Sequence, residues 1–348
     1  LKPVDLTPYQ AEEFFGMRYA REALDLDPAF QPAQVVMMNL MLERHYRPQL
    51  DQILVKPVPP KMLQLLTSLD TDLMIRVLER ALEERQLPVA LPIIQALGER
   101  GEFRAARPSA AGQQRGIVKA LYYPDRRVQF AAFKAMLRMP KTTTPAVAAD
   151  RVVDLARRFL ASDLTASKAL LVYPPLGQEP DIRKIIKDLG YDAITARKTH
   201  EAVELGKKTA DFDLLVLHRG APEVDFPFVL AQLRQHYDLA GIPMVIVVSK
   251  ERERIVQKQV GKDPGVLIIT EDRFVPGDEL KNLIESHVKR MHIARLTPEE
   301  RKMFAQFSMD TLWRMGRGDI EGYSVVPAID VIVAQLESKD YVLEAIEI

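Results

Sequence analysis

Cysteine is absent from the 348 residues, and this absence removes three kinds of chemistry at once. A chain without thiols forms no disulfide, carries no thiolate nucleophile and offers no sulfur ligand to a metal. The histidines supply no metal motif either, because His287 and His292 are five residues apart and fall on different faces of one helix. We therefore predict neither a metal site nor a cofactor.

An excess of either charge is absent as well, since 48 Lys and Arg residues balance 48 Asp and Glu residues. Proteins that bind nucleic acid usually carry a basic excess, because neutralising phosphates dominates their affinity. No apolar run approaches the ~20 residues that span a bilayer. We predict no nucleic-acid partner and no membrane span in this fragment.

Sequence motifs of common enzymes are also missing. The chain has no GxSxG, no GxGxxG after a strand, no HExxH and no phosphate-binding glycine loop ending in Lys-Ser or Lys-Thr. No nucleophile with a partner base can be named. The sequence therefore predicts no catalytic residue and a protein that is not an enzyme.

The ends of the chain suggest a fragment of a longer protein. It begins at Leu1 rather than at Met and stops within an amphipathic pattern at EAIEI. A preceding export signal would fall outside such a fragment. The compartment is left open, with a cytoplasmic location favoured over export.

Glycine is scarce in the first half of the chain, where apolar residues recur at helical spacing. The phrase REALDLDP resembles the second helix of a tetratricopeptide (TPR) repeat. The phrase DRRVQFAAFKAML is similar to the second helix of a HEAT repeat, with Asp125 as the helix cap. These resemblances imply a solenoid-like α-helical repeat region over residues 1–164, which buries its faces by stacking. The expected buried stripe of the HEAT-like helix is Val128, Ala131, Ala132, Ala135 and Leu137.

Short apolar runs alternate with helical segments after Ser167. The five runs KALLVY, DAITAR, DLLVLH, PMVIVVS and GVLIIT are too continuously apolar for a sheet with one exposed face. This alternation predicts a doubly wound, five-stranded parallel α/β domain of flavodoxin-like type over residues 165–293. Residues 294–348 return to helices: Thr297 and Glu300 fit a capping box, and residues 323–348 resemble a HEAT-like helix pair. The fold class is thus multidomain, α and α/β.

The order of features within residues 165–293 resembles a response-regulator receiver domain. The phrases LGYDAITARKTHEAVEL, DFDLLVLHRGAP and GIPMVIVVSK carry this resemblance. It implies an acidic pair after the first strand, a phosphate-accepting aspartate ending the third, a hydroxyl residue ending the fourth and a lysine ending the fifth. In this chain Tyr173 and Pro-Pro-Leu follow the first strand, and His218 ends the third. The position of the hydroxyl residue falls on Val248 or Ser249, and that of the lysine falls on Thr270.

These substitutions remove the receiver's phosphorylation chemistry, since Mg²⁺ needs carboxylate oxygens and an aspartyl phosphate needs a cation to balance its charge. We interpret the domain as a degenerate, pseudo-receiver module. A local hydrogen bond is the favoured role of His218, and phosphorylation of its imidazole is the alternative. For the whole chain we predict a protein-interaction scaffold with protein partners. The alternative function is a small-ligand sensor, with the ligand at the strand ends near Tyr173, His218, Ser249 and Thr270.

Overall fold

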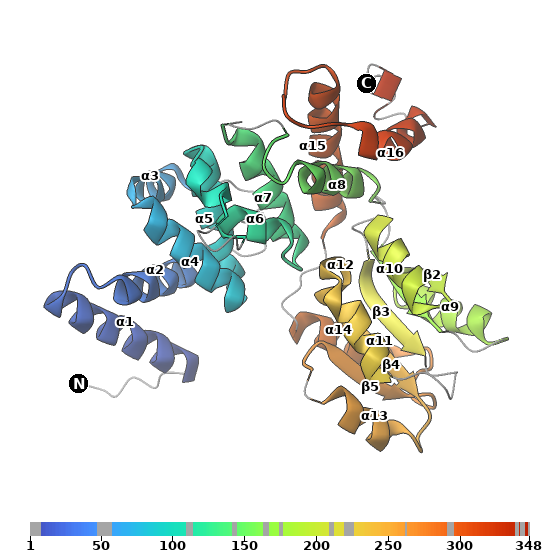
Figure 1. The fold of residues 1–348 in the computed structure, drawn as a ribbon. Coiled ribbons are helices and arrows are strands. Elements are labelled where there is room, and N and C mark those ends of the chain that lie inside the picture. Colours follow the sequence, from blue (N-terminus) through green and yellow to red (C-terminus); the bar gives the residue numbers. More distant parts are fainter. Residues whose placement is uncertain are drawn as a thin grey trace. The chain divides into compact units, whose positions relative to one another are not determined.

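The chain folds into two compact units in the computed structural model (Figure 1). The first comprises residues 1–123 and 127–152, and the second comprises residues 124–126 and 153–348. The residues that the structure describes are 8–46, 58–108, 114–140, 145–162, 167–173, 177–208, 212–218, 226–261, 263–290, 296–337, 341 and 345–346.

The described part of the first unit is built from helices that pack on helices close to them in sequence. α1 packs on α2, α2 on α4 and α5, and α4 on α5 and α6. This confirms the predicted helical character of the first half, while its assignment to TPR or HEAT repeats stays a prediction. The elements are α1 (Pro8–Leu26), α2 (Gln31–Tyr46), α3 (Pro60–Ser68), α4 (Thr71–Glu83), α5 (Leu87–Glu99), the 3₁₀ helix η2 (Phe103–Ala106), α6 (Gly116–Leu121), α7 (Arg126–Arg138) and α8 (Ala149–Leu160), the last of which ends in the second unit.

Helix α7 contains the HEAT-like phrase, and its buried face is wider than predicted. Val128, Ala132 and Ala135 are buried as expected, whereas Ala131 and Leu137 are only half-buried. The difference arises because this helix also buries large side chains outside the expected stripe. Those side chains are Phe130, Phe133 and Met136.

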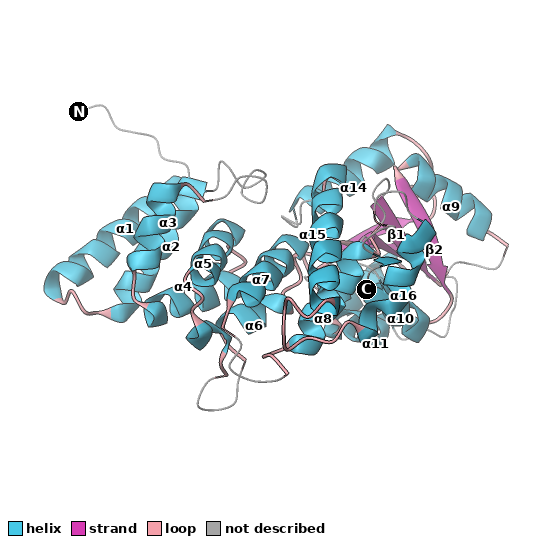
Figure 2. Cartoon of the chain, turned by 90° about the horizontal axis from the view of Figure 1, so that it is seen from above, coloured by secondary structure: helices cyan, strands magenta, loops and turns pink. Residues whose placement is uncertain are grey.

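The second unit contains a five-stranded sheet with strand order β2-β1-β3-β4-β5, and all its strand pairs are parallel (Figure 2, strands in magenta). This order and direction are those of a flavodoxin-like, doubly wound fold, so the predicted fold class is confirmed. The strands are β1 (Ser167–Val172), β2 (Tyr191–Ala196), β3 (Phe212–His218), β4 (Met244–Val248) and β5 (Val266–Thr270).

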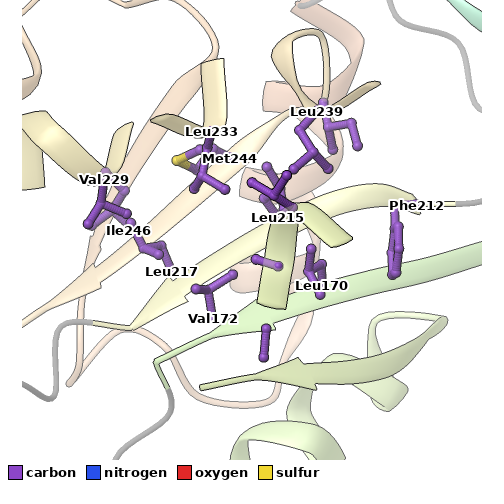
Figure 3. Close-up of a cluster of buried hydrophobic side chains, with 14 of the residues drawn as sticks. Leu170, Val172, Phe212, Leu215, Leu217, Val229, Leu233, Leu239, Met244 and Ile246 are labelled. Atoms are coloured by element: carbon purple, nitrogen blue, oxygen red, sulfur yellow. The ribbon is translucent and has the colours of Figure 1, made fainter. Parts of the chain in front are cut away.

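Helices cover both faces of this sheet. Side chains of α9 and α14 pack on one face, and side chains of α10, α11 and α13 pack on the other. Figure 3 shows part of the layer on the second face, where Val229 lies beside Ile246 and Leu233 lies beside Met244. Because β3 is enclosed on both faces, all its residues are buried. The helices are α9 (Glu179–Asp188), α10 (Thr199–Lys208), α11 (Phe226–Gln235), α12 (Tyr237–Ala240), α13 (Glu253–Val260) and α14 (Asp278–Arg290).

The C-terminal helices belong to the same compact unit as the sheet. They are α15 (Pro298–Gly316), η3 (Val326–Ala328), α16 (Ile329–Ala334) and η4 (Gln335–Glu337). The predicted capping box is present: the Thr297 hydroxyl accepts from the Glu300 amide at 3.2 Å, and the Glu300 carboxylate accepts from the Thr297 amide at 2.8 Å. The rings of Phe159 on α8 and Phe304 on α15 meet edge to face, with centroids 5.2 Å apart.

The predicted domain boundaries at residues 164 and 293 stay a prediction, because the sheet, α15 and α16 all belong to one compact unit. The second helix predicted near the C-terminus, over residues 340–348, lies mostly outside the described residues. Within the described part of the chain, every helix is too short or too polar to cross a bilayer.

Candidate functional site

The four residues singled out from the sequence lie at the carboxyl edge of the parallel sheet. Tyr173 follows the last residue of β1, His218 and Thr270 end β3 and β5, and Ser249 follows the last residue of β4. The register places Val172 beside Leu217, His218 beside Val247, and Val248 beside Thr270. The edge between β1 and β3 is the topological switch point, where folds of this type bind ligands.

Tyr173 is held against the turn between β2 and α10. Its backbone has a left-handed φ of 55°, which is uncommon for a residue other than glycine. Its amide donates to the Ala196 carbonyl at 3.0 Å. Its hydroxyl lies 2.6 Å from the Thr199 Oγ1 and accepts from the Thr199 amide at 3.2 Å. Thr199 is buried, so the phenol is already committed within the protein.

His218 is buried, with 5% of its surface exposed. Burial lowers the pKa of its imidazole below the ordinary value of 6.5, because a charged ring would lose its hydration there. Its Nδ1 has no hydrogen-bond partner among the described residues. The third strand therefore ends in a neutral imidazole that carries neither the negative charge nor the acceptor oxygens of an aspartate.

Burial of His218 predicts a specific dependence of stability on pH. The unfolded chain takes up a proton near pH 6.5, whereas the folded imidazole does so only at lower pH. The contribution of His218 to folding is therefore complete above pH 6.5 and is lost as pH falls from 6.5 through the folded pKa. We expect His218→Leu to remove the part of the pH dependence of the free energy of unfolding that comes from His218. Urea unfolding of the intact chain between pH 7.5 and 5 measures it. The same substitution at the exposed His200 is the matched control. Parallel pH profiles for His218→Leu and the wild type would contradict the assignment.

Ser249 and Thr270 are committed to the turns that follow their strands. The Ser249 hydroxyl stabilises the carboxylate of Glu251, and the Thr270 hydroxyl stabilises that of Asp272. The pKa of Glu251 is lowered by its own backbone amide and then by Ser249, and that of Asp272 is lowered first by Thr270. A hydroxyl residue two positions before an acidic one is the sequence signal for such local contacts.

At the described strand ends, the residues expected in a receiver's phosphorylation site are replaced by others. Tyr173 rather than a carboxylate follows β1, and β3 and β5 end in His218 and Thr270 rather than in Asp and Lys. Tyr173 supplies no carboxylate oxygen, which is the kind of ligand that Mg²⁺ prefers. Throughout the described residues, His, Asp and Glu side chains nowhere gather in a group of three or more that could hold a metal ion.

Comparison with known proteins adds two distant structural matches. The chain is similar to a signal receiver domain of an HD domain-containing protein from Pseudomonas fluorescens Pf-5, at 16% identity and a TM-score of 0.31, covering 38% of this chain and 93% of that domain. It is also similar to an adenylate cyclase from Rhodopirellula baltica, at 13% identity and a TM-score of 0.31, covering 36% of this chain and 90% of that one. No protein-family model matches the chain, and neither does any curated protein. The fold assignment accordingly rests on strand order and direction.

Proposed function

We propose that this protein is a non-catalytic interaction scaffold, in which TPR-like or HEAT-like helices bind protein partners and the α/β domain is a receiver unable to accept phosphate. The observation that carries the interaction role is a set of exposed aromatic side chains on α1. Phe14, Phe15 and Tyr19 are 56%, 46% and 63% exposed. Large apolar side chains gathered on a surface mark binding sites in soluble proteins.

The chemistry of the carboxyl edge supports the second half of the proposal. The Tyr173 hydroxyl is hydrogen-bonded to Thr199, and the Ser249 and Thr270 hydroxyls stabilise the neighbouring carboxylates of Glu251 and Asp272. His218 is neutral and buried where an acceptor carboxylate would be needed. A strand edge with this chemistry suits a structural or docking role better than a phosphorylation switch.

Beryllofluoride tests whether the receiver-like domain is inert, since with Mg²⁺ it mimics a phosphoryl group on an aspartate. We expect the melting temperature of the intact chain to stay unchanged when both are added. The matched variant His218→Asp restores only the acceptor, and we expect no shift for it either, because Tyr173 and Thr270 still replace the other groups. A stabilisation of the wild-type chain that grows with beryllofluoride concentration would contradict the proposal.

The interaction role is tested by affinity capture on the immobilised intact chain, followed by direct binding of each recovered protein to the purified chain. We expect at least one partner that binds with a measurable Kd. Recovery of no direct partner under conditions where the chain is folded would contradict a scaffold.

A small-ligand sensor is the second candidate. It is favoured by the Nδ1 of His218, which has no hydrogen-bond partner among the described residues. An unpaired buried polar atom usually marks a strained site or a missing partner. Native mass spectrometry of the intact chain separates the two functions. A scaffold gives the mass of the chain alone, whereas a sensor purified with its ligand gives a defined excess mass that His218→Leu abolishes.

A further inference from the structure

A methionine-lined groove lies on the first unit, where α1, α2 and α3 come together. Two adjoining hollows of about 520 Å³ and 450 Å³ share Met17 and Arg44 in their walls. Five of the chain's 13 methionines line them, and we call this surface the methionine groove. Its methionines are Met17, Met37, Met38, Met41 and Met62.

Exposed apolar side chains border the methionine groove. Phe14 lines one hollow, while Met41 and Leu65, which are 46% and 48% exposed, line the other. Phe15 stacks on Tyr19 further along α1, with ring centroids 6.4 Å apart. An unbranched thioether changes rotamer at little cost, so methionine-rich surfaces adapt to the apolar face of a partner.

Positive charge surrounds the apolar floor of the groove. Arg18, Arg21 and Arg44 line it together with a single carboxylate, Glu13. Arg18 pairs with Glu22 at 2.8 Å, and Arg44 lies 3.6 Å from Glu13, but both arginines are more than half exposed. Exposed ion pairs contribute little to stability. A partner's carboxylates can therefore replace Glu22 and Glu13 as the partners of these arginines at small cost in stability.

The wider charge distribution argues against a polyanion as the occupant. Residues 8–46 carry three arginines and six carboxylates, a net charge of −3, so a continuous phosphate backbone would be repelled outside the groove. A peptide with a few spaced carboxylates avoids this repulsion and still pairs with the arginines of the lining.

We propose that the methionine groove binds an acidic amphipathic helix of a partner protein. Its apolar residues, spaced at i, i+3, i+4 and i+7, enter the two hollows, and its carboxylates pair with Arg18, Arg21 and Arg44. This inference rests on the proposed scaffold role and assigns that role a surface and a class of partner.

Two labelled peptides test the inference by fluorescence anisotropy on the intact chain. Each is about 18 residues long, which gives five helical turns. One carries Leu on one face and three spaced Glu residues among Gln on the other, and its counterpart has Lys in place of every Glu. We expect the glutamate peptide to bind at least roughly tenfold more tightly than the lysine peptide, and less tightly as salt is raised.

Groove variants show where the peptide binds. We expect Met41→Glu to weaken the glutamate peptide by roughly tenfold or more, since a carboxylate then faces both an apolar surface and like charge. Arg44→Glu should reduce the ratio of the affinities for the glutamate peptide and the lysine peptide. Ile255→Glu is the matched control, because Ile255 is 53% exposed on α13 of the second unit, and it should leave binding unchanged.

Several outcomes would overturn the inference. They are no binding of the glutamate peptide at about 100 μM, equal affinity for both peptides, or equal binding by Met41→Glu and the wild type. If the chain bound phosphatidylserine vesicles and not the peptide, and Met41→Glu abolished vesicle binding, the groove would be a membrane-binding site. If the chain self-associated and Met41→Glu abolished self-association, the groove would bind a second copy of the chain. If captured partners bind Met41→Glu as well as wild type, the scaffold role stands and only the groove assignment fails.

Discussion

Replacing Asp213 with alanine should destabilise the second unit by about 3–5 kcal/mol, the usual cost of removing one partner from a buried ion pair. Asp213 is the second residue of β3, and 7% of its surface is exposed. Its Oδ1 accepts from Arg126 at 2.6 Å and its Oδ2 accepts from Arg301 at 2.5 Å. Arg126 also donates to the carbonyl of Phe212. Alanine would leave two guanidinium groups, one of them almost fully buried, without a counter-charge.

Hydrogen exchange of peptides from β3, followed by mass spectrometry, measures this loss within the second unit. The expected fall in protection is on the order of a hundredfold to a thousandfold, since 1.4 kcal/mol corresponds to a factor of ten. Asp192→Ala on β2 is the matched control, because Asp192 is exposed and its loss should leave protection nearly unchanged.

A double variant separates the ion pair from general damage to the fold. Asp213→Leu combined with Arg301→Met replaces the charged pair with apolar side chains, an exchange that is often neutral or stabilising in buried sites. We expect the double variant to be more stable than Asp213→Leu alone. Additive losses from the two substitutions would show that the pair is not coupled.

Gly98→Ala should destabilise the first unit by about 1–3 kcal/mol, although alanine is the better helix former. A Cβ at Gly98 would lie 2.8 Å from both the Cα and the Cβ of Ala135. Backbone cannot rotate away as a side chain can, so α5 and α7 must separate to admit one methyl group. Hydrogen exchange of peptides from both helices measures the effect.

Gly16→Ala provides an internal control with the same change of residue in the same unit. Its Cβ would meet only the end of a flexible side chain, with Leu40 Cδ1 at 3.0 Å. A small rotation of Leu40 relieves that contact, and the helix gains up to about 1 kcal/mol in propensity. We expect Gly16→Ala to be neutral or stabilising. Equal effects of the two substitutions would mean that the close approach at Gly98 does not constrain the helices.

The sequence alone was sufficient for the parallel sheet, because its signal is local. A strand enclosed on both faces is mostly apolar, and this pattern is continuous through β4 and from Leu214 to Leu217 in β3. The capping box at Thr297 and Glu300 was equally predictable, since its partners are three residues apart. The replacement of the receiver's acidic residues was also visible directly, as strand ends follow from the same pattern.

Tertiary structure decided how the polar residues are used. Asp213 binds Arg301, which is 88 positions away, and no local pattern in the sequence predicts this pairing. The hydroxyl of Tyr173 is bound by Thr199, 26 positions away, and is therefore committed within the protein. The methionine groove likewise forms only when α1, α2 and α3 meet. Hydrophobic periodicity records which face of an element is buried, but partners distant in the chain are chosen by packing, and no local pattern encodes that choice.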